Sequence, residues 1–314
     1  MKTALRLGLI ALVLFLVWSW QDGVRDITGA IRQAGWQTIP LLCLAHLLSM
    51  TLCGLAWGRL LGERQMTRFI LARWVREAVS EIAGFLPLSG ELAGARLLTR
   101  HAIRPALAGA LTVVDVTAEV IAQFIFSLVG VGLWIWRYPD SQILQWGLMG
   151  LAGSIPVLMA FFFLQRSKMM RFIETLPSRL MPKFWQTPDL DVGLHATIAT
   201  LYADRRRFAS AVGFHLLAWL VSTLEAWLGL LMLGHPMALA DVIAMESIIF
   251  ALRSAAFLIP GALGIQEGGY VLVGAALLLP PPLALALSLL KRGRELTLGL
   301  PALLAWHFIE RRQG

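Results

Sequence analysis

Residues 73–100 read RWVREAVSEIAGFLPLSGELAGARLLTR and lie between long apolar segments. The stretch holds four arginines and three glutamates around one proline and three glycines. An unbroken membrane-spanning helix would not carry so many charges, because ionised side chains are costly in hydrocarbon. Irregular backbone at membrane depth is tolerated only where protein or a water-filled cavity surrounds it. The stretch therefore predicts a broken or re-entrant helical hairpin inside a bundle of membrane helices.

A second stretch, residues 246–269, repeats this order of features with the sequence ESIIFALRSAAFLIPGALGIQEGG. A charged helical lead-in is followed by a proline, a glycine-rich break and a glutamate. Two interrupted segments in corresponding halves of a hydrophobic chain are typical of transporters built from inverted repeats, with a binding site near the bilayer midplane. The similarity between the halves rests on Pro87, Gly90 and Glu91 in the first and on Pro260, Gly261, Gly264 and Glu267 in the second.

The composition indicates that the bilayer is the solvent. Of the 314 residues, 58% are hydrophobic and 15% are charged, whereas a soluble domain has about 45–50% apolar and about 25% charged residues. The formal net charge is +8, but the basic residues alternate with apolar spans, which is the pattern of cytoplasmic loops in membrane proteins. We therefore expect an all-α polytopic membrane protein and no nucleic-acid partner.

Hydropathy predicts about six full transmembrane helices in addition to the two broken hairpins. Residues 38–60 have about the right length to cross a hydrocarbon core of about 30 Å. A signal peptide is the alternative for the first one, but no small-x-small cleavage site follows it, so an uncleaved span is favoured. The predicted spans are 4–20, 38–60, 106–134, 143–164, 209–233 and 283–309.

We expect a single transmembrane domain over residues 1–314, with a first half (1–164), a basic loop (165–207) and a second half (208–314). The loop contains the run Arg205-Arg206-Arg207 and is placed in the cytoplasm by the positive-inside rule. Within it, residues 168–185 predict either a helix on the inner leaflet or a solvated linker. The basic C-terminal tail places both termini in the cytoplasm.

Charged and helix-breaking residues within these segments are the candidates for a substrate path or for ion coupling. Two structural alternatives stay open: a ladder of interfacial ion pairs over residues 73–81, and a simple helix kink at residues 260–264. The basic cluster at residues 291–295 either lies at depth, where it would bind a phosphate or pair with the acids of the 106–134 span, or anchors the helix at the interface. The candidates are Glu77, Glu81, Pro87, Gly90, Glu91, Arg96, Asp115, Glu119, Arg253, Pro260, Gly261, Gly264, Glu267, Arg292, Arg294 and Glu295.

Sequence signatures of catalysis are missing from the chain. It contains no G-x-S-x-G, H-E-x-x-H or Walker motif. Its two cysteines, Cys43 and Cys53, lie in one apolar run, which indicates neither a zinc site nor a disulfide scaffold. We therefore expect neither an enzyme nor a bound cofactor or metal.

Three segments carry a resemblance to a known family: REAVSEIAGFLPLSGELAGARLL (76–98), FALRSAAFLIPGALGIQEGGYVLVGAAL (250–277) and LALSLLKRGRELTLGLPALLAW (285–306). They resemble the membrane region of the lysylphosphatidylglycerol synthase/flippase family and are most similar to its HpnL-type members, which are associated with hopanoid biosynthesis. The resemblance implies an inner-membrane protein that moves a lipid between leaflets or towards the outer membrane. The cargo would be a hopanoid, or an aminoacylated phospholipid as in the broader family. Because no soluble synthase domain follows the last span, we expect no synthesis of lysylphosphatidylglycerol.

Three functions remain open at this point. A lipid transporter or flippase is favoured; the alternatives are a lipid-modifying enzyme, with Glu91 or Glu267 as base, and a non-transporting scaffold of a biosynthetic complex. The expected partners are a membrane lipid and the bilayer, and a homo-oligomer stays open.

Overall fold

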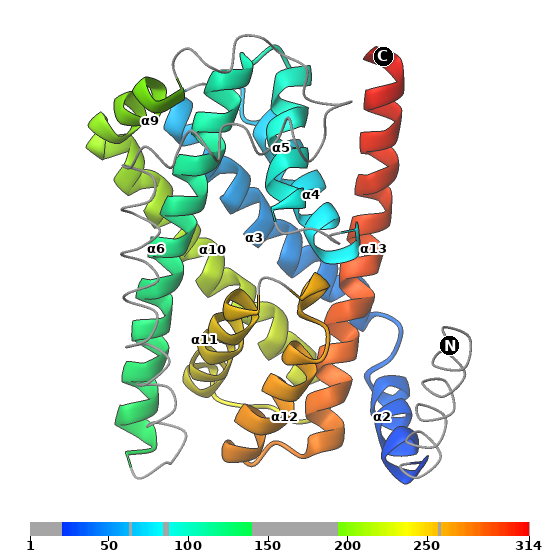
Figure 1. The fold of residues 1–314 in the computed structure, drawn as a ribbon. Coiled ribbons are helices and arrows are strands. Elements are labelled where there is room, and N and C mark those ends of the chain that lie inside the picture. The colour runs from blue at the N-terminus through cyan, green and yellow to red at the C-terminus, as the bar shows by residue number, and fades with distance from the viewer. Residues whose placement is uncertain (1–20, 63–64, 84–87, 140–193, 257–258, 314) are drawn as a thin grey trace, which may run out of the picture.

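The computed structural model describes residues 21–62, 65–83, 88–139, 194–256 and 259–313. The predicted spans 4–20 and 143–164, residues 165–193 of the predicted loop, and Pro87 lie outside these ranges. Within them all regular structure is helical (Figure 1). The helices are α2 (Gln21–Ala34), α3 (Thr38–Leu61), α4 (Thr67–Ala78), α5 (Ser89–Arg100), α6 (Pro105–Arg137), α9 (Leu194–Ala203), α10 (Arg205–Met232), α11 (Leu239–Ala255), α12 (Ile265–Ala276) and α13 (Pro281–Gln313), with a π-helical segment η1 (Val79–Ala83) and a 3₁₀ turn η3 (Pro260–Ala262).

Three of these helices, α3, α6 and α10, are long and apolar enough to cross a membrane. They coincide with the predicted spans 38–60, 106–134 and 209–233, which are thereby confirmed as long apolar helices. Helix α13 is as long as α6, at 33 residues, but it carries charged residues in its middle. The protein is thus a multi-pass helical membrane protein.

Both predicted breaks interrupt a helix where proline and glycine cluster. In the first hairpin, α4 passes into η1, and α5 begins after Leu88, whose φ is 65°. In the second, α11 is followed by η3 and α12, with left-handed backbone at Gly261 and Gly264. The hairpins approach from opposite ends of the bundle, and their tips meet near its middle (Figure 1). A Cβ on Gly261 would lie 2.9 Å from the carbonyl oxygen of Glu81, so the contact requires glycine at this position.

Several basic segments gather at one end of the bundle. Arg207, at the start of α10, donates to the carbonyl of Leu61 at the end of α3. Arg100, at the end of α5, donates to Glu310 near the C-terminus. In Figure 1 this is the upper end, where α9 and the C-terminus also lie.

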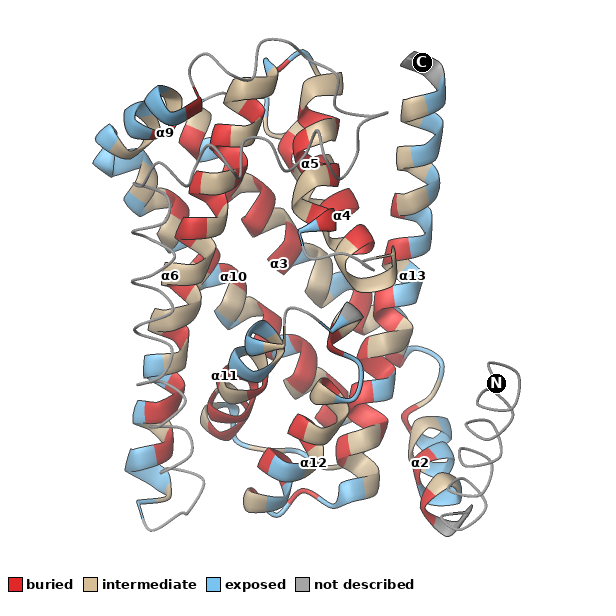
Figure 2. Ribbon diagram, in the orientation of Figure 1, coloured by how far each residue is buried: buried red, intermediate tan, exposed pale blue. Residues whose placement is uncertain are grey.

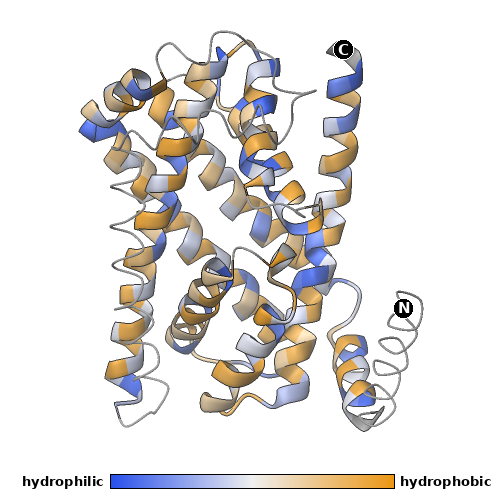
Figure 3. Ribbon diagram, in the orientation of Figure 1, coloured by the Kyte–Doolittle hydropathy of each residue, from blue (hydrophilic) through white to orange (hydrophobic). Residues whose placement is uncertain are grey.

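Burial follows the pattern of a protein dissolved in lipid rather than in water. Charged side chains such as Asp115, Glu225 and Lys291 are buried inside the bundle, whereas large apolar ones such as Leu128, Leu272 and Leu304 are exposed on its outside. Figures 2 and 3 show this distribution, with buried residues on the inward faces and hydrophobic residues on outward faces. An exposed apolar surface of this extent is stable in hydrocarbon, where it replaces lipid–lipid contacts.

Two segments that lie between the predicted spans are helical. Residues 194–203 of the predicted 165–207 loop form α9, which packs on α6 and buries Leu194 and Ile198. The polar stretch after the first predicted span forms α2, which contacts α13 and buries Ile27. Both helices are shorter than the window of about 19 residues over which hydropathy is averaged, so the averages do not reveal them.

Helices α6 and α11 approach so closely at Gly130 that a side chain there would not fit. A Cβ on Gly130 would overlap the Cβ and Oγ of Ser247, whereas a Cβ on Gly132 has open space around it. We predict that Gly130→Ala lowers the free energy of unfolding by about 1–3 kcal/mol through overpacking. Gly132→Ala is the matched control and gains helix propensity of about 1 kcal/mol. Thermal unfolding in detergent measures both, and equal unfolding temperatures would contradict the close approach.

Candidate functional site: a charged cavity between the hairpins

A cavity of about 440 Å³ lies where the two hairpins meet α3, α6, α10 and α13. Its wall holds six carboxylates, four arginines, one lysine and one histidine, together with apolar side chains. The ionisable residues on the wall are Glu77, Glu81, Glu91, Glu119, Glu225, Glu295, Arg73, Arg76, Arg253, Arg294, Lys291 and His46. A cavity with both signs of charge and apolar faces can accept the polar end of an amphipathic molecule.

An ion pair joins the tips of the two hairpins at this cavity. Arg253 of α11 donates from Nη2 to both carboxylate oxygens of Glu81 in η1, at 2.8 and 2.9 Å. Its Nη1 donates to Oε1 of Gln266 in α12 at 2.5 Å. The side chains of Arg253 and Glu81 are only 15% and 22% exposed. Because a partly desolvated pair interacts strongly, this contact ties the first broken segment to the second.

The first hairpin is also held to α6. Arg76 donates to Asp115 at 2.9 Å and to Glu119 at 2.8 Å, and Arg73 donates to both oxygens of Glu119 at 2.9 and 2.8 Å. The suggestion that the 291–295 cluster pairs with these two acids is therefore wrong. Arg73 and Arg76 of α4 are the partners of both acids, whereas the sequence suggested ion pairs of Arg73 only within residues 73–81.

The cluster at residues 291–295 lies inside the bundle, so its interpretation as an interfacial anchor is also wrong. Lys291 is 2% exposed and donates to Glu246 and to Tyr270, each at 2.7 Å. Arg294 donates to Glu225 of α10 at 2.9 Å. Burial of these cations is tolerated because each faces a carboxylate.

Glu295 is buried on the cavity wall, between cations of its own helix and of α11. Arg292 donates to it at 2.9 Å, and Arg253 lies 3.6 Å from it. It therefore adds a second acid to the charge network around the hairpin tips.

Glu91 is the least constrained of the cavity carboxylates. Its shortest described polar contact is with Arg76, whose Nη2 lies 3.4 Å away, and its side chain is 23% exposed. The preceding Gly90 lets α5 approach α4, since a Cβ there would overlap the side chain of Ser80 and the carbonyl of Arg76. Glu91 therefore faces the cavity with free hydrogen-bonding capacity.

Two other predicted site residues, Glu267 and Arg96, are not among the described residues that line the cavity. Glu267 accepts from the backbone N–H of Gly264 at 2.7 Å and from Arg292 at 3.0 Å, so it caps α12. Arg96 points away and pairs with Glu310 at 3.2 Å. Pro260 opens η3.

The site also contains residues that sequence analysis did not select, above all His46 and Glu225. His46 of α3 lies between Glu77 of α4 and Glu225 of α10. A single histidine in an apolar span gives no signal by itself, because its partners lie 31 and 179 residues away. Glu225 and His215, in the 209–233 span, carried a signal as ionisable groups at membrane depth.

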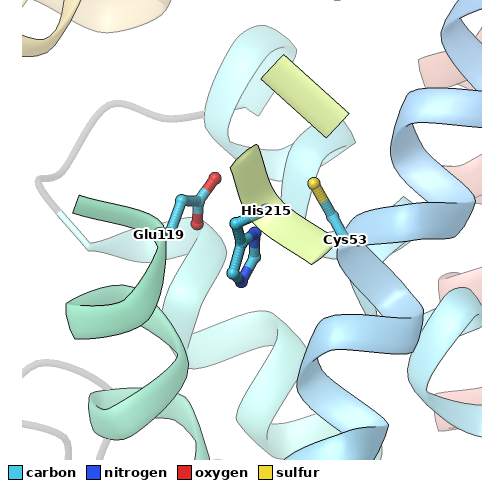
Figure 4. Close-up of side chains that lie close together, drawn as sticks. All are labelled: Cys53, Glu119 and His215. Atoms are coloured by element: carbon cyan, nitrogen blue, oxygen red, sulfur yellow. The ribbon is translucent and has the colours of Figure 1, made fainter. Parts of the chain in front are cut away.

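Cys53, Glu119 and His215 lie close together (Figure 4), with ligand atoms within 4.8 Å of one another, and the first two line the cavity. His215 donates from Nε2 to Oδ1 of Asp115 at 2.9 Å. Both oxygens of Glu119 already accept from guanidinium groups. A metal cation here would face two arginines, so the charges favour an ion-pair network over a metal site.

The fold and the cavity define a class of protein: a helical, multi-pass membrane protein with broken helices around a charged interior site. The family model described as the lysylphosphatidylglycerol synthase TM region matches residues 3–302. The chain therefore belongs to the lysylphosphatidylglycerol synthase TM region family. No curated protein and no solved structure is significantly similar to it.

The buried Lys291–Glu246 pair should show a large single-mutant penalty. Lys291→Met leaves Glu246 without its cation, and loss of one partner of a buried pair costs about 3–5 kcal/mol. Adding Glu246→Gln should recover most of the loss, because the amide oxygen still accepts from Tyr270 and no charge is left unpaired. Chemical denaturation in detergent measures both variants. A double variant as unstable as Lys291→Met alone would show that the two charges are not coupled.

Proposed function

We propose that the protein is a lipid transporter or flippase. The observation that carries this proposal is the meeting of two broken helical hairpins at a charged cavity inside a bundle with an apolar exterior. Exposed helix ends and paired charges can bind a polar head group, while the outer surface stays in contact with lipid. Membership of the lysylphosphatidylglycerol synthase TM region family supports a lipid ligand.

We propose a topology of about six full spans and two re-entrant hairpins arranged as an inverted repeat, in the bacterial inner membrane. The approach of the hairpins from opposite ends of the bundle supports it (Figure 1). The basic segments that share one end support a cytoplasmic location for that end and for both termini. Under this topology the cavity lies near the bilayer midplane.

The proposed cargo is a hopanoid or a related lipid, as in HpnL-type proteins. Most charges of the cavity wall are paired with one another, so the site offers hydrogen-bonding groups more than net charge. Such a wall suits a polyol head group, and Met50, Val116 and Phe250 of the same wall supply apolar contact. The proposed role is transport without chemistry on the lipid and without a cofactor.

The membrane distribution of lipids tests this proposal. Inner and outer membranes would be separated from cells with and without the protein, and their hopanoids and phospholipids quantified. Hopanoids that are unchanged in total but retained in the inner membrane support export. A changed total or a missing hopanoid species supports a lipid-modifying enzyme or a scaffold instead, and an unchanged profile refutes hopanoid transport.

Glu91→Gln should impair lipid movement while the protein remains inserted and folded, because Glu91 faces the cavity and holds little of the fold together. Loss of one charged hydrogen bond to the head group, worth about 1.5–3 kcal/mol, predicts roughly a tenfold or greater decrease in rate. Glu310→Gln is the matched control, since it removes the same charge outside the cavity. Leaflet exchange of lipid in reconstituted vesicles measures both. Equal rates in the two variants would remove Glu91 from the lipid path.

A further inference from the structure

His46 occupies an unusual position between two carboxylates of the cavity wall. Its Nδ1 lies 3.1 Å from Oε2 of Glu225, and its Nε2 contacts Oε1 of Glu77. The three residues come from α3, α10 and α4, so the imidazole ring joins three helices. Their side chains are 13%, 1% and 21% exposed, and all three line the cavity.

The two hydrogen bonds that join Glu77, His46 and Glu225, here called the Glu77–His46–Glu225 chain, require one proton more than a neutral imidazole and two carboxylates carry. An ionised carboxylate only accepts hydrogen bonds, and a neutral imidazole has a single N–H to donate. Two nitrogen–carboxylate contacts therefore need a proton beyond those of a neutral ring and two carboxylates. Without that proton, a nitrogen lone pair would face a carboxylate oxygen. The Glu77–His46–Glu225 chain thus holds one dissociable proton.

The surrounding charges provide a second arrangement for the deprotonated ring. Arg294 of α13 donates to Glu225 at 2.9 Å, and its Nη1 lies 3.3 Å from His46 Nε2 and 3.8 Å from Glu77. Arg73 of α4 lies 3.8 Å from Glu77. Once the proton leaves, His46 Nε2 can accept from Arg294 and no longer binds Glu77. Proton loss therefore exchanges a contact with α4 for a contact with α13.

We infer that His46 is the proton-coupling residue of the cavity, and that proton binding and release at the Glu77–His46–Glu225 chain drive lipid movement. The inference rests on the proposed transport function. Glu77 lies one helical turn before Glu81, whose carboxylate binds Arg253 of the second hairpin. Release of Glu77 thus loosens the first hairpin next to its π-helical segment and next to the contact between the hairpin tips. A proton gradient would supply the energy.

The first test measures the proton directly, without lipid transport. The histidine ring nitrogens of the full-length protein in nanodiscs would be isotope-labelled and followed by NMR between about pH 5 and about pH 8. We expect the His46 ring to carry hydrogen on both nitrogens at low pH and to lose one proton as pH rises; since the chain has six histidines, its signal is identified by substitution. The signal should disappear in His46→Gln and persist in His307→Gln, which alters an exposed histidine of α13. A His46 ring with one protonation state throughout this range would overturn the inference.

The second test measures coupling. Vesicles of phosphatidylglycerol, phosphatidylethanolamine and a hopanoid would be assayed for leaflet exchange with and without a gradient of one pH unit. For a single titrating group, one pH unit changes the population of the minor form about tenfold, so the gradient should accelerate exchange up to about tenfold in wild type and in His307→Gln. His46→Gln should lose this acceleration.

The two tests separate the inference from the function on which it rests. Lipid that moves equally with and without the gradient in wild type overturns the inference and leaves transport standing. If no lipid moves under any condition, the transport proposal and the coupling role both fail, although the NMR titration still identifies His46 as a proton-binding residue.

Discussion

The ion pair between Glu81 and Arg253 is the contact on which the centre of the molecule depends. It lies where two interrupted helices meet, and its partners are 172 residues apart in the chain. In a medium of low dielectric a single buried charge is costly. Arg253 of the second hairpin therefore stabilises the carboxylate of Glu81 in the first, and Glu81 stabilises the guanidinium of Arg253. The glycine at position 261 serves the same contact, because its missing side chain lets η3 reach the carbonyl of Glu81.

The same constraint explains why the breaks and the charges occur together. A helix that stops inside a membrane leaves backbone groups without partners, and these are tolerated only next to polar neighbours. The 73–100 stretch places its arginines and glutamates on both sides of its break, and α6 brings Asp115 and Glu119 to the same level. The cavity is what remains among these side chains after they have paired.

Hydropathy and helix-breaking residues were sufficient to predict α3, α6, α10 and the positions of the two interruptions, because both signals are local in sequence. The partners of the charged residues were not predictable in this way. Glu225 binds His46 and Arg294, which lie in different helices 179 and 69 residues away. Asp115 and Glu119 share a helical face, as expected, but only tertiary packing selects Arg73 and Arg76 over the cations of α13. Glu267 was expected in the site because it follows a break, yet its position in the first turn of α12 makes it a cap.

The charged side chains of the network differ in how far they are buried, and this difference affects which of them can exchange partners in a transport cycle. Lys291, Glu246 and Tyr270 are almost completely buried, and His215 with Asp115 is equally enclosed. Exchange of partners there would leave a desolvated charge alone, at a cost of several kcal/mol. The glutamates of the first hairpin, by contrast, are each more than 20% exposed at the cavity. Water or a head group can replace a partner of these side chains at lower cost. Within the proposed function, the first hairpin is therefore the part that responds to ligand and proton, and the α11–α12–α13 unit is the rigid support against which it moves.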